Sequence, residues 1–277
     1  MDLRTAITQG NLLLQQGGIS VPRLTAEVLL AHAIGKDRSY FYAHPEEELS
    51  ELGWIHYGRY LHQRLQRMPT QYITKQQEFW SRVFRVTPDV LIPRPETEHL
   101  IETVLTESPG AQQIADIGVG SGAIAVTLAL ELKANVIATD ISTAALSVAA
   151  SNAQKHGASV KLVNCDLCSA LRTASLDLIA SNPPYVPESG RAQLEPEVRE
   201  WEPQQALFAG EDGLGLYPRL ILDAHRVLKP GGLFVAEMGL DQSDALLAML
   251  SSGWDQVHTI ADLAGIPRVV SARRSNV

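Results

Sequence analysis

The sequence is poor in cysteine and lacks long hydrophobic runs, and both shortages exclude whole classes of protein. Its 277 residues include two cysteines, Cys165 and Cys168, and two thiols alone cannot complete a structural zinc site. Their spacing is that of a redox motif, but they do not open a helix after a thioredoxin-like strand. No apolar run approaches the length of a membrane span, and the start of the chain lacks the organisation of a signal peptide. We therefore expect a cytoplasmic protein with no membrane partner.

Basic residues are also in short supply. Lys and Arg number 23 against 31 Asp and Glu, which gives a formal net charge of -8. A mainly electrostatic grip on a phosphate backbone needs clustered Lys and Arg, so no direct nucleic-acid partner is expected. The eight histidines are scattered without ligand spacing, and no metal is predicted.

The first 70 residues read as a small helical bundle. Apolar residues predict one buried face of a first helix, which Gly17-Gly18 ends: Leu3, Ile7, Leu13 and Leu14. Further helices are expected over residues 24–34 and about 50–66. Aromatic and β-branched residues between 71 and 93 then predict a β-hairpin linker. The bundle shows no catalytic constellation, so its expected role is substrate recognition or structural support.

From residue 94 to 277 strands and helices alternate. Strands are expected at 113–117, 135–139, 160–164, 176–181 and 233–237, with two more near 254–260 and 269–273. A turn is expected at Lys229-Pro230-Gly231-Gly232, just before the fifth strand. This alternation predicts an α/β protein with a doubly wound, seven-stranded sheet and helices on both faces.

A glycine-rich loop follows the first of these strands. Gly118-Val119-Gly120-Ser121-Gly122 lets the backbone pass close to a ligand and aims the N–H groups of a helix start at it. The pattern also fits a dinucleotide-binding loop, so a dehydrogenase is an alternative. Asp140, at the end of the next strand, suits a ribose diol in either case. Asp116, two residues before the first glycine, suits a cofactor with a cationic amino-acid end.

The segment Asn182-Pro183-Pro184-Tyr185 ends the fourth strand, where open α/β sheets bind ligands. Proline has a carbonyl but no N–H, so the loop presents the Asn182 side-chain oxygen and backbone carbonyls as acceptors. Two acceptors can hold a planar NH2 group so that its lone pair points out of plane, and Tyr185 is placed to stack on that group. Asp166 and Leu167, after the third strand, suit an adenine amino group and ring. Together these features favour S-adenosylmethionine and methyl transfer to an NH2 nitrogen over hydride transfer.

The loops around Gly118 and Asn182 resemble those of the class I methyltransferases that modify planar nitrogens, namely adenine in DNA, guanine in RNA or glutamine in proteins. The helical start, Glu78-Phe79-Trp80 and the segment from Leu91 to Glu98 are, over nearly the whole chain, similar to the HemK/PrmC family. That resemblance implies methylation of the glutamine N5 in the Gly-Gly-Gln loop of class 1 peptide release factors. Methylation of a ribosomal protein, or of adenine or guanine amino groups, stays as an alternative.

The resemblance also implies roles for individual residues. Asn182, Pro183 and Tyr185 would be catalytic, and with Pro184 they would bind the substrate glutamine. Residues implied to contact the cofactor are Gly118, Val119, Gly120, Ser121, Gly122, Asp140, Asp166, Leu167 and Asn182. Some relatives carry Trp at the position of Leu167. For two features, alternatives stay open. Pro93-Arg94-Pro95 either covers the cofactor site or is an interdomain turn. Glu197 either shapes the entrance for the substrate or is a solvated acid in a loop.

Overall fold

The computed structural model describes residues 1–276 and divides the chain into two compact units. Unit 1 contains Met1–Gln76 together with the short segment Glu195–Trp201, and unit 2 contains the remainder of the described chain. The backbone therefore leaves unit 2 after Leu194 and re-enters it at Glu202. No helix of residues 1–276 combines the length and the apolar character needed to cross a membrane.

Unit 1 is built from helices. They are α1 (Leu3–Gln16), α2 (Pro22–Ile34), α3 (Tyr40–Ala43), α4 (Glu51–Leu65), α5 (Thr70–Thr74) and α9 (Pro196–Trp201). The Asp2 carboxylate accepts a hydrogen bond from the Thr5 N–H at 2.7 Å, and the Ser50 hydroxyl accepts one from the Gly53 N–H at 3.1 Å. These side chains satisfy N–H groups that a helix start leaves unpaired, so α1 and α4 begin where they do.

The buried face of α1 differs from the prediction. Leu13 is exposed, while Ala6 and Gly10 are buried between Leu3 and Leu14. Those four residues follow the three-to-four spacing of one helix face, and Leu13 lies one residue off it. At Gly10 a Cβ atom would come within 1.9 Å of the Tyr57 hydroxyl, so this glycine permits the close packing of α1 on α4.

Unit 2 opens with the predicted hairpin, which is shorter than the predicted range. Its strands are β1 (Gln76–Phe79) and β2 (Arg82–Arg85). The two turn residues, Trp80 and Ser81, have φ values of 50° and 55°, as a tight hairpin turn requires. The Asn152 side chain accepts from the Arg85 N–H at 2.7 Å and donates to the Ser121 carbonyl at 2.8 Å, so it ties the hairpin to the glycine-rich loop.

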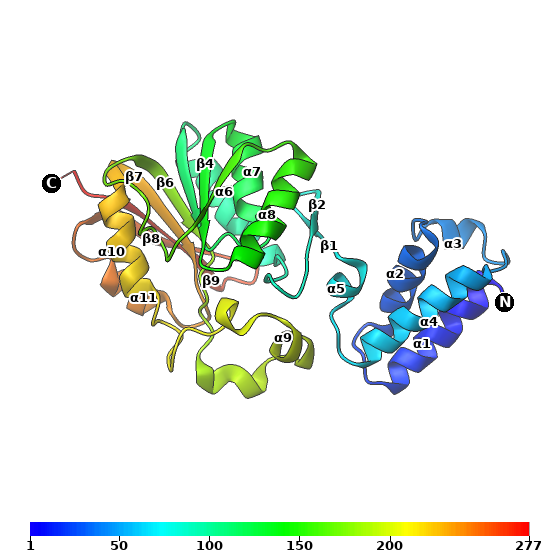
Figure 1. The fold of residues 1–277 in the computed structure, drawn as a ribbon. Helices are drawn as coiled ribbons and strands as arrows, with labels where there is room; N and C mark the ends of the chain where they lie inside the picture. Colours follow the sequence, from blue (N-terminus) through cyan, green and yellow to red (C-terminus); the bar gives the residue numbers. More distant parts are fainter. Residues whose placement is uncertain (277) are drawn as a thin grey trace. The chain divides into compact units, whose positions relative to one another are not determined.

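The core of unit 2 is a seven-stranded sheet with the order β5-β4-β3-β6-β7-β9-β8 (Figure 1). Its strands are β3 (Gln113–Ile117), β4 (Asn135–Asp140), β5 (Val160–Asn164), β6 (Leu176–Ser181), β7 (Leu228–Glu237), β8 (Trp254–Ala261) and β9 (Pro267–Arg274). The first five in spatial order are parallel, and β9 is antiparallel to both β7 and β8. The predicted doubly wound fold is confirmed.

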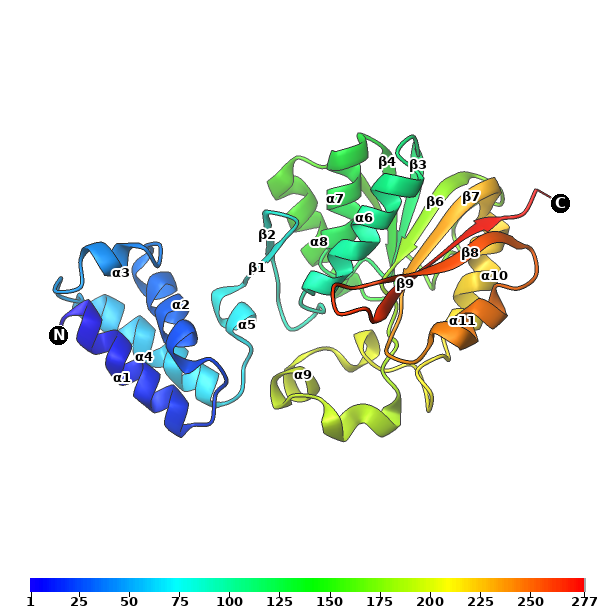
Figure 2. The ribbon, with the colours of Figure 1, turned by 180° about the vertical axis from the view of Figure 1, so that it is seen from behind.

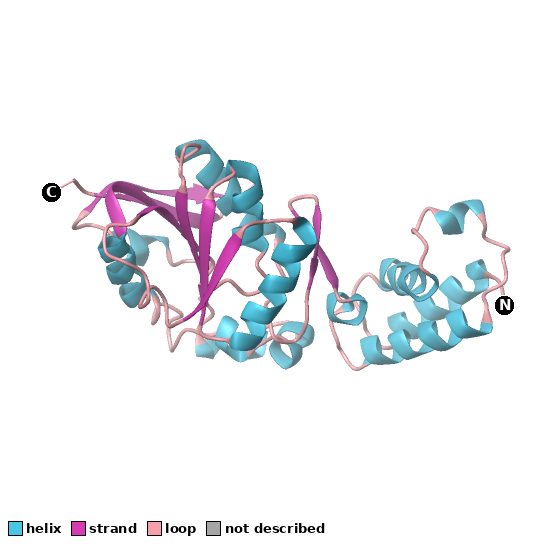
Figure 3. Cartoon of the chain, turned by 45° about the horizontal axis from the view of Figure 1, so that its top comes forward, coloured by secondary structure: helices cyan, strands magenta, loops and turns pink. Residues whose placement is uncertain are grey.

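Helices cover both faces of this sheet. A cluster of buried residues joins one face to α6 (Glu98–Glu107), α7 (Ala123–Leu132) and α8 (Thr143–His156). A second cluster joins the other face to α10 (Tyr217–Val227) and α11 (Ser243–Met249). Figure 2 shows α6, α7 and α8 together on one side, and Figure 3 shows the strands fanning out between helices. The two apolar layers fix the strand ends where the loops of the site begin.

One predicted turn is wrong. Lys229-Pro230-Gly231-Gly232 lies inside β7 and does not precede it. The pairing jumps from Leu176 with Leu228 to Leu178 with Leu233, so the extra residues of β7 bulge out of the ladder. Gly231 has a φ of 75°, and a bulge is where a strand accommodates both proline and glycine. Several short helices were not predicted, among them η2 (Glu188–Gln193), α9, η3 (Gln204–Ala206) and α11.

Candidate active site

A cavity of about 610 Å³ opens at the carboxyl ends of β3, β4 and β6. All the residues that line it belong to unit 2 and come from the range 89–219. Parallel strands leave a crevice at this edge of an open sheet, where loops from neighbouring strands diverge. Of the residues predicted for the site, the cavity is lined by Gly118, Val119, Gly120, Ser121, Asp140, Asp166, Leu167, Asn182 and Pro184.

The glycine-rich loop turns sharply at the cavity floor. Gly118, Gly120 and Gly122 have φ values of 79°, 51° and 85°, a region that favours glycine. The N–H groups of Gly118 and Val119 both donate to the Thr139 carbonyl at 2.9 Å, which fastens the loop to β4. Gly122 does not line the cavity; it caps α7, where a Cβ atom would lie 3.2 Å from Ala149. Its role is therefore close packing of α7 on α8.

Asp116 does not reach the cavity, contrary to the sequence expectation. Its side chain is fully buried, and Oδ2 accepts a hydrogen bond from the Ala125 N–H in the first turn of α7 at 2.9 Å. Burial, with a smaller contribution from the Asp140 carboxylate, raises the pKa of Asp116 to about 7. The residue fastens the start of α7 beneath the loop and does not line the cavity.

Asp140 has the position expected for a ribose ligand. Its Oδ2 accepts from the Gly120 N–H at 3.0 Å and its Oδ1 accepts from the Ser142 N–H at 2.8 Å. A carboxylate oxygen has two lone pairs, so both oxygens retain capacity for a diol in the cavity. Ile141, which sequence reasoning missed, also lines the cavity and is 66% exposed. The available signal was an apolar residue directly after the strand-end acid.

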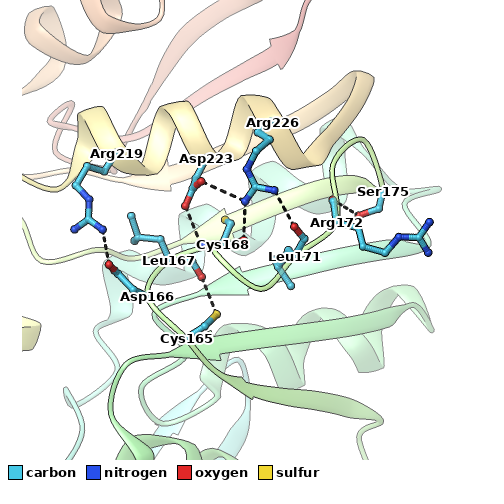
Figure 4. Close-up of polar contacts among 10 residues, drawn as sticks. All are labelled: Cys165, Asp166, Leu167, Cys168, Leu171, Arg172, Ser175, Arg219, Asp223 and Arg226. Atoms are coloured by element: carbon cyan, nitrogen blue, oxygen red, sulfur yellow. Dashed lines mark hydrogen bonds and ion pairs between the residues drawn. The ribbon is translucent and has the colours of Figure 1, made fainter.

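Asp166 and Leu167 lie in the loop after β5, opposite α10 (Figure 4). The Asp166 carboxylate forms an ion pair with Arg219 of α10, and both residues line the cavity. Leu167 has a φ of 48°, a left-handed conformation that is uncommon for a branched side chain. Such a conformation persists only where surrounding contacts hold it.

Two side chains of α10 supply such contacts. The Asp223 carboxylate accepts from the Cys168 N–H at 3.2 Å, and the Arg226 guanidinium donates to the carbonyls of Cys168 and Leu171, both at 2.8 Å (Figure 4). Cys168 itself is buried, and burial raises the pKa of its thiol to about 12. Both cysteines are free thiols, and a buried thiol with a raised pKa, such as that of Cys168, is a poor nucleophile.

The Asn182–Tyr185 segment is held from behind. The Ser181 hydroxyl, at the end of β6, donates to the Ile117 carbonyl at 2.7 Å. Pro183 is buried and does not line the cavity. Tyr185 also lies behind the cavity wall: its hydroxyl donates to Glu237 Oε1 at 3.0 Å, and its carbonyl accepts from Gln242 Nε2 at 3.0 Å. Direct contacts of Pro183 and Tyr185 with a substrate therefore stay predictions.

Asn182 has one amide end bonded and the other free. Its Nδ2 donates to the Thr97 Oγ1 at 3.1 Å. Its Oδ1 is buried and has no hydrogen-bond partner within residues 1–276. A buried polar atom without a partner costs free energy, on the order of 1–3 kcal/mol, unless a bound group satisfies it. Asn182 Oδ1 is thus an unsatisfied acceptor at the cavity, and a donor on a bound ligand could satisfy it.

Two parts of the cavity wall come from outside the predicted site residues: residues 203–210, and the segment that leads into Pro93-Arg94-Pro95. Leu91 and Pro93 line the cavity, whereas the Arg94 guanidinium donates to the buried Glu202 carboxylate at 2.5 Å. Glu202 also accepts from the Ile92 N–H at 3.3 Å. This segment is therefore fastened beside the cavity by an acid that the sequence did not single out.

Glu197 lies in unit 1 and does not line the cavity. Its Oε1 accepts from the Arg64 guanidinium at 2.5 Å, and both side chains are mostly buried. Trp201, also in α9, donates from its indole N–H to the Gln66 carbonyl at 3.2 Å. These contacts attach α9 to the end of α4, and they replace the interpretation of Glu197 as a solvated acid.

Two family models match the chain. The PrmC N-terminal domain matches residues 5–74, and the Methyltransferase small domain matches residues 95–195. The first match falls on the helices of unit 1. The second contains the glycine-rich loop, Asp140, Asp166 and Asn182.

Similar proteins cover almost the whole chain. A release factor glutamine methyltransferase of Koribacter versatilis is 41% identical over 278 residues, covering 99% of each chain. One of Moorella thermoacetica is 42% identical over 281 residues, again covering 99% of each chain. Among solved structures, a ribosomal protein L11 methylase from Lactobacillus delbrueckii subsp. bulgaricus aligns with a TM-score of 0.51 at 19% identity. That alignment covers 72% of this chain and 90% of the methylase, and it shows the shared fold.

Proposed function

The chain belongs to the release factor glutamine methyltransferase family, and from this we infer that it methylates a release factor on glutamine. We propose that the methyl group of S-adenosylmethionine is transferred to the side-chain amide nitrogen, N5, of the glutamine in a Gly-Gly-Gln loop. The substrate would be a class 1 peptide chain release factor, and the site of action the cytoplasm.

One observation carries the chemical part of this proposal. The Asn182 Oδ1 is buried at the cavity and lacks a partner among the described residues, while its Nδ2 is already engaged by Thr97. The unsatisfied end of this buried side chain is therefore its acceptor, Oδ1, while the NH2 end is held by Thr97. A primary amide nitrogen carries two hydrogens and complements such a group, whereas a carboxylate does not.

The residues around the cavity suit S-adenosylmethionine. The glycine-rich loop leaves backbone close to a ligand, the Asp140 carboxylate suits a ribose diol, and Leu167 and Ile141 give apolar surface for an adenine ring. Asp166 offers an acceptor for an adenine amino group, in competition with Arg219. When bound, S-adenosylmethionine supplies a methyl group activated by its sulfonium. The contacts of individual residues with it are part of the proposal.

The residues must align a poor nucleophile. An amide nitrogen shares its lone pair with the carbonyl, so it reacts only when held with that lone pair turned toward the methyl group. Asn182 Oδ1 would accept one amide hydrogen and favour the positive charge that develops on nitrogen. The small residues of the Gly-Gly-Gln loop would let the peptide backbone approach the Asn182–Tyr185 segment closely. The proton can leave after transfer, so no covalent enzyme intermediate is required.

The test is mass spectrometry of an intact release factor after incubation with the protein and isotopically labelled S-adenosylmethionine. We expect one added methyl group on the glutamine of the Gly-Gly-Gln loop. A factor with Gly-Gly-Glu in that loop is the matched control and should gain none. Labelling of a ribosomal protein or of nucleic acid amines, with the factor unlabelled, would favour the alternative substrates.

Two variants separate cofactor binding from chemistry in this assay. Asp140→Ala should weaken S-adenosylmethionine binding by about tenfold to hundredfold, as for the loss of a charged hydrogen bond. Asn182→Ala should lower turnover by about a hundredfold, far more than it weakens cofactor binding measured by calorimetry. Near-normal turnover of Asn182→Ala would show that the loop is only a turn.

A further inference from the structure

Glu237 is a buried acid directly behind the site. It ends β7 beside the end of β6 and is 2% exposed. Both of its carboxylate oxygens accept hydrogen bonds from hydroxyl groups: Oε2 from Thr97 at 2.6 Å, and Oε1 from Tyr185 at 3.0 Å. The remaining charged groups that influence it are Glu96 and Arg268. Thr97 falls in the Leu91–Glu98 segment that supported the family resemblance, but no role was predicted for it, and none was predicted for Glu237.

The Thr97 hydroxyl has one hydrogen, and that hydrogen is given to Glu237. Toward Asn182, Thr97 can therefore act only as an acceptor. The Asn182 group that faces it at 3.1 Å is the Nδ2 donor. If the amide were reversed, Asn182 Oδ1 would face Thr97 Oγ1 with no hydrogen between the two oxygens, in a buried environment. The chain of hydrogen bonds from Glu237 through Thr97 thus determines which end of the Asn182 amide faces the cavity.

We propose that Thr97 and Glu237 are positioning residues that hold the Asn182 amide with Oδ1 toward the substrate amide nitrogen. This inference rests on the proposed function for the identity of that nitrogen. An asparagine free to flip would present its own NH2 group about as readily and would then repel the substrate donor. Burial raises the pKa of Glu237, but the two hydroxyl donors that face it lower that pKa and favour the ionised form. An ionised carboxylate can only accept, so it determines the direction of both hydrogen bonds.

The test compares Thr97→Val with Thr97→Ser. Valine keeps the shape of threonine but removes the hydroxyl, whereas serine keeps the hydroxyl. We expect Thr97→Val to lower kcat on the release factor by about tenfold to hundredfold, with cofactor affinity within about threefold of wild type. Thr97→Ser should restore most of that loss. Equal losses in both variants, together with weaker cofactor binding, would mean that Thr97 only supports the fold and would overturn the proposal.

A second readout depends on the direction of the amide alone. A factor with Gly-Gly-Glu in its loop should inhibit wild type weakly, because a carboxylate meets an acceptor. In Thr97→Val the Asn182 amide can turn its NH2 group toward that carboxylate. The ratio of the inhibition constant of the Gly-Gly-Glu factor to the KM of the Gly-Gly-Gln factor should therefore fall. Glu237→Gln should change the ratio in the same direction but less, because its NH2 group can face either Thr97 or Tyr185. An unchanged ratio in Thr97→Val would overturn the proposal.

The third readout requires no substrate. The side-chain NH2 resonance of Asn182, assigned by its loss in Asn182→Ala, should report a hydrogen-bonded amide in wild type and Thr97→Ser but not in Thr97→Val. Failure of wild type to methylate any release factor would refute the proposed function and leave this readout intact. An Asn182 resonance unaffected by Thr97→Val would refute the inference even if methylation proceeds.

Discussion

Asp140 ends β4 and Asp116 is the last but one residue of the neighbouring β3, yet the two carboxylates have different roles. Asp140 lies at the rim, keeps lone pairs free and lines the cavity. Asp116 is fully buried, and its Oδ2 accepts a hydrogen bond from the Ala125 N–H, while its Oδ1 has no partner within residues 1–276. Burial is the main difference between the two, and burial, with a smaller contribution from the Asp140 carboxylate, raises the pKa of Asp116 to about 7.

That raised pKa has a measurable consequence for stability. A carboxyl whose pKa is higher in the folded than in the unfolded state binds its proton more tightly when folded. Its contribution is fully present below the unfolded value, near 4, and is lost as the pH rises to about 7. Wild type should therefore lose stability across this window relative to Asp116→Asn, with a slope of at most about 1.4 kcal/mol per pH unit. Denaturant unfolding at several pH values measures it, and parallel curves for both proteins would contradict the prediction.

At the scale of elements, the loop after β5 depends on α10. Figure 4 shows Arg219, Asp223 and Arg226 along one side of the helix, each directed at this loop. The sequence places Asp166 and Leu167 after a strand, but it does not indicate which helix braces them. Since Leu167 has a left-handed backbone, its position depends on that brace.

Arg226→Met should loosen the loop without unfolding the protein. The variant keeps an apolar stem but removes the donors to the Cys168 and Leu171 carbonyls. We expect faster hydrogen exchange over residues 165–175 and S-adenosylmethionine binding weakened by about tenfold, or roughly 1.4 kcal/mol. Arg172→Met, at an exposed position in the same loop, is the matched control and should change neither. If both variants behave alike, α10 does not hold the loop.

At the scale of the whole molecule, the cavity and the match to the PrmC N-terminal domain fall on different parts of the chain. Every residue that lines the cavity lies in unit 2, and the PrmC N-terminal domain match lies in unit 1. We propose that unit 1 binds the release factor away from its loop and raises the local concentration of that loop at the cavity. The predicted boundaries at about 70 and 93 belong to this proposal.

This division predicts a large difference between substrates. A short Gly-Gly-Gln peptide should have a kcat/KM at least about a hundredfold below that of the intact factor, because it lacks the second contact. Deleting residues 1–74 should reduce activity on the factor toward that of the peptide, with cofactor affinity retained; thermal melting with and without cofactor checks that the shortened chain is folded. A peptide as good as the factor would place all recognition at the cavity.

The sequence by itself determined the fold class, the family and most of the cavity floor. Apolar periodicity predicts the strands, the three glycines permit a loop with positive φ, and the two adjacent prolines fix φ, so the loops at the strand ends follow from local chemistry. It could not reveal the roles of Thr97, Glu237 and Arg226, because ordinary residues acquire such roles only through partners distant in the chain. The same holds for the burial of Asp116 and for the Lys229–Gly232 bulge in β7. Tertiary packing decided these points, since it alone sets which polar groups lose water and which partner each must then find.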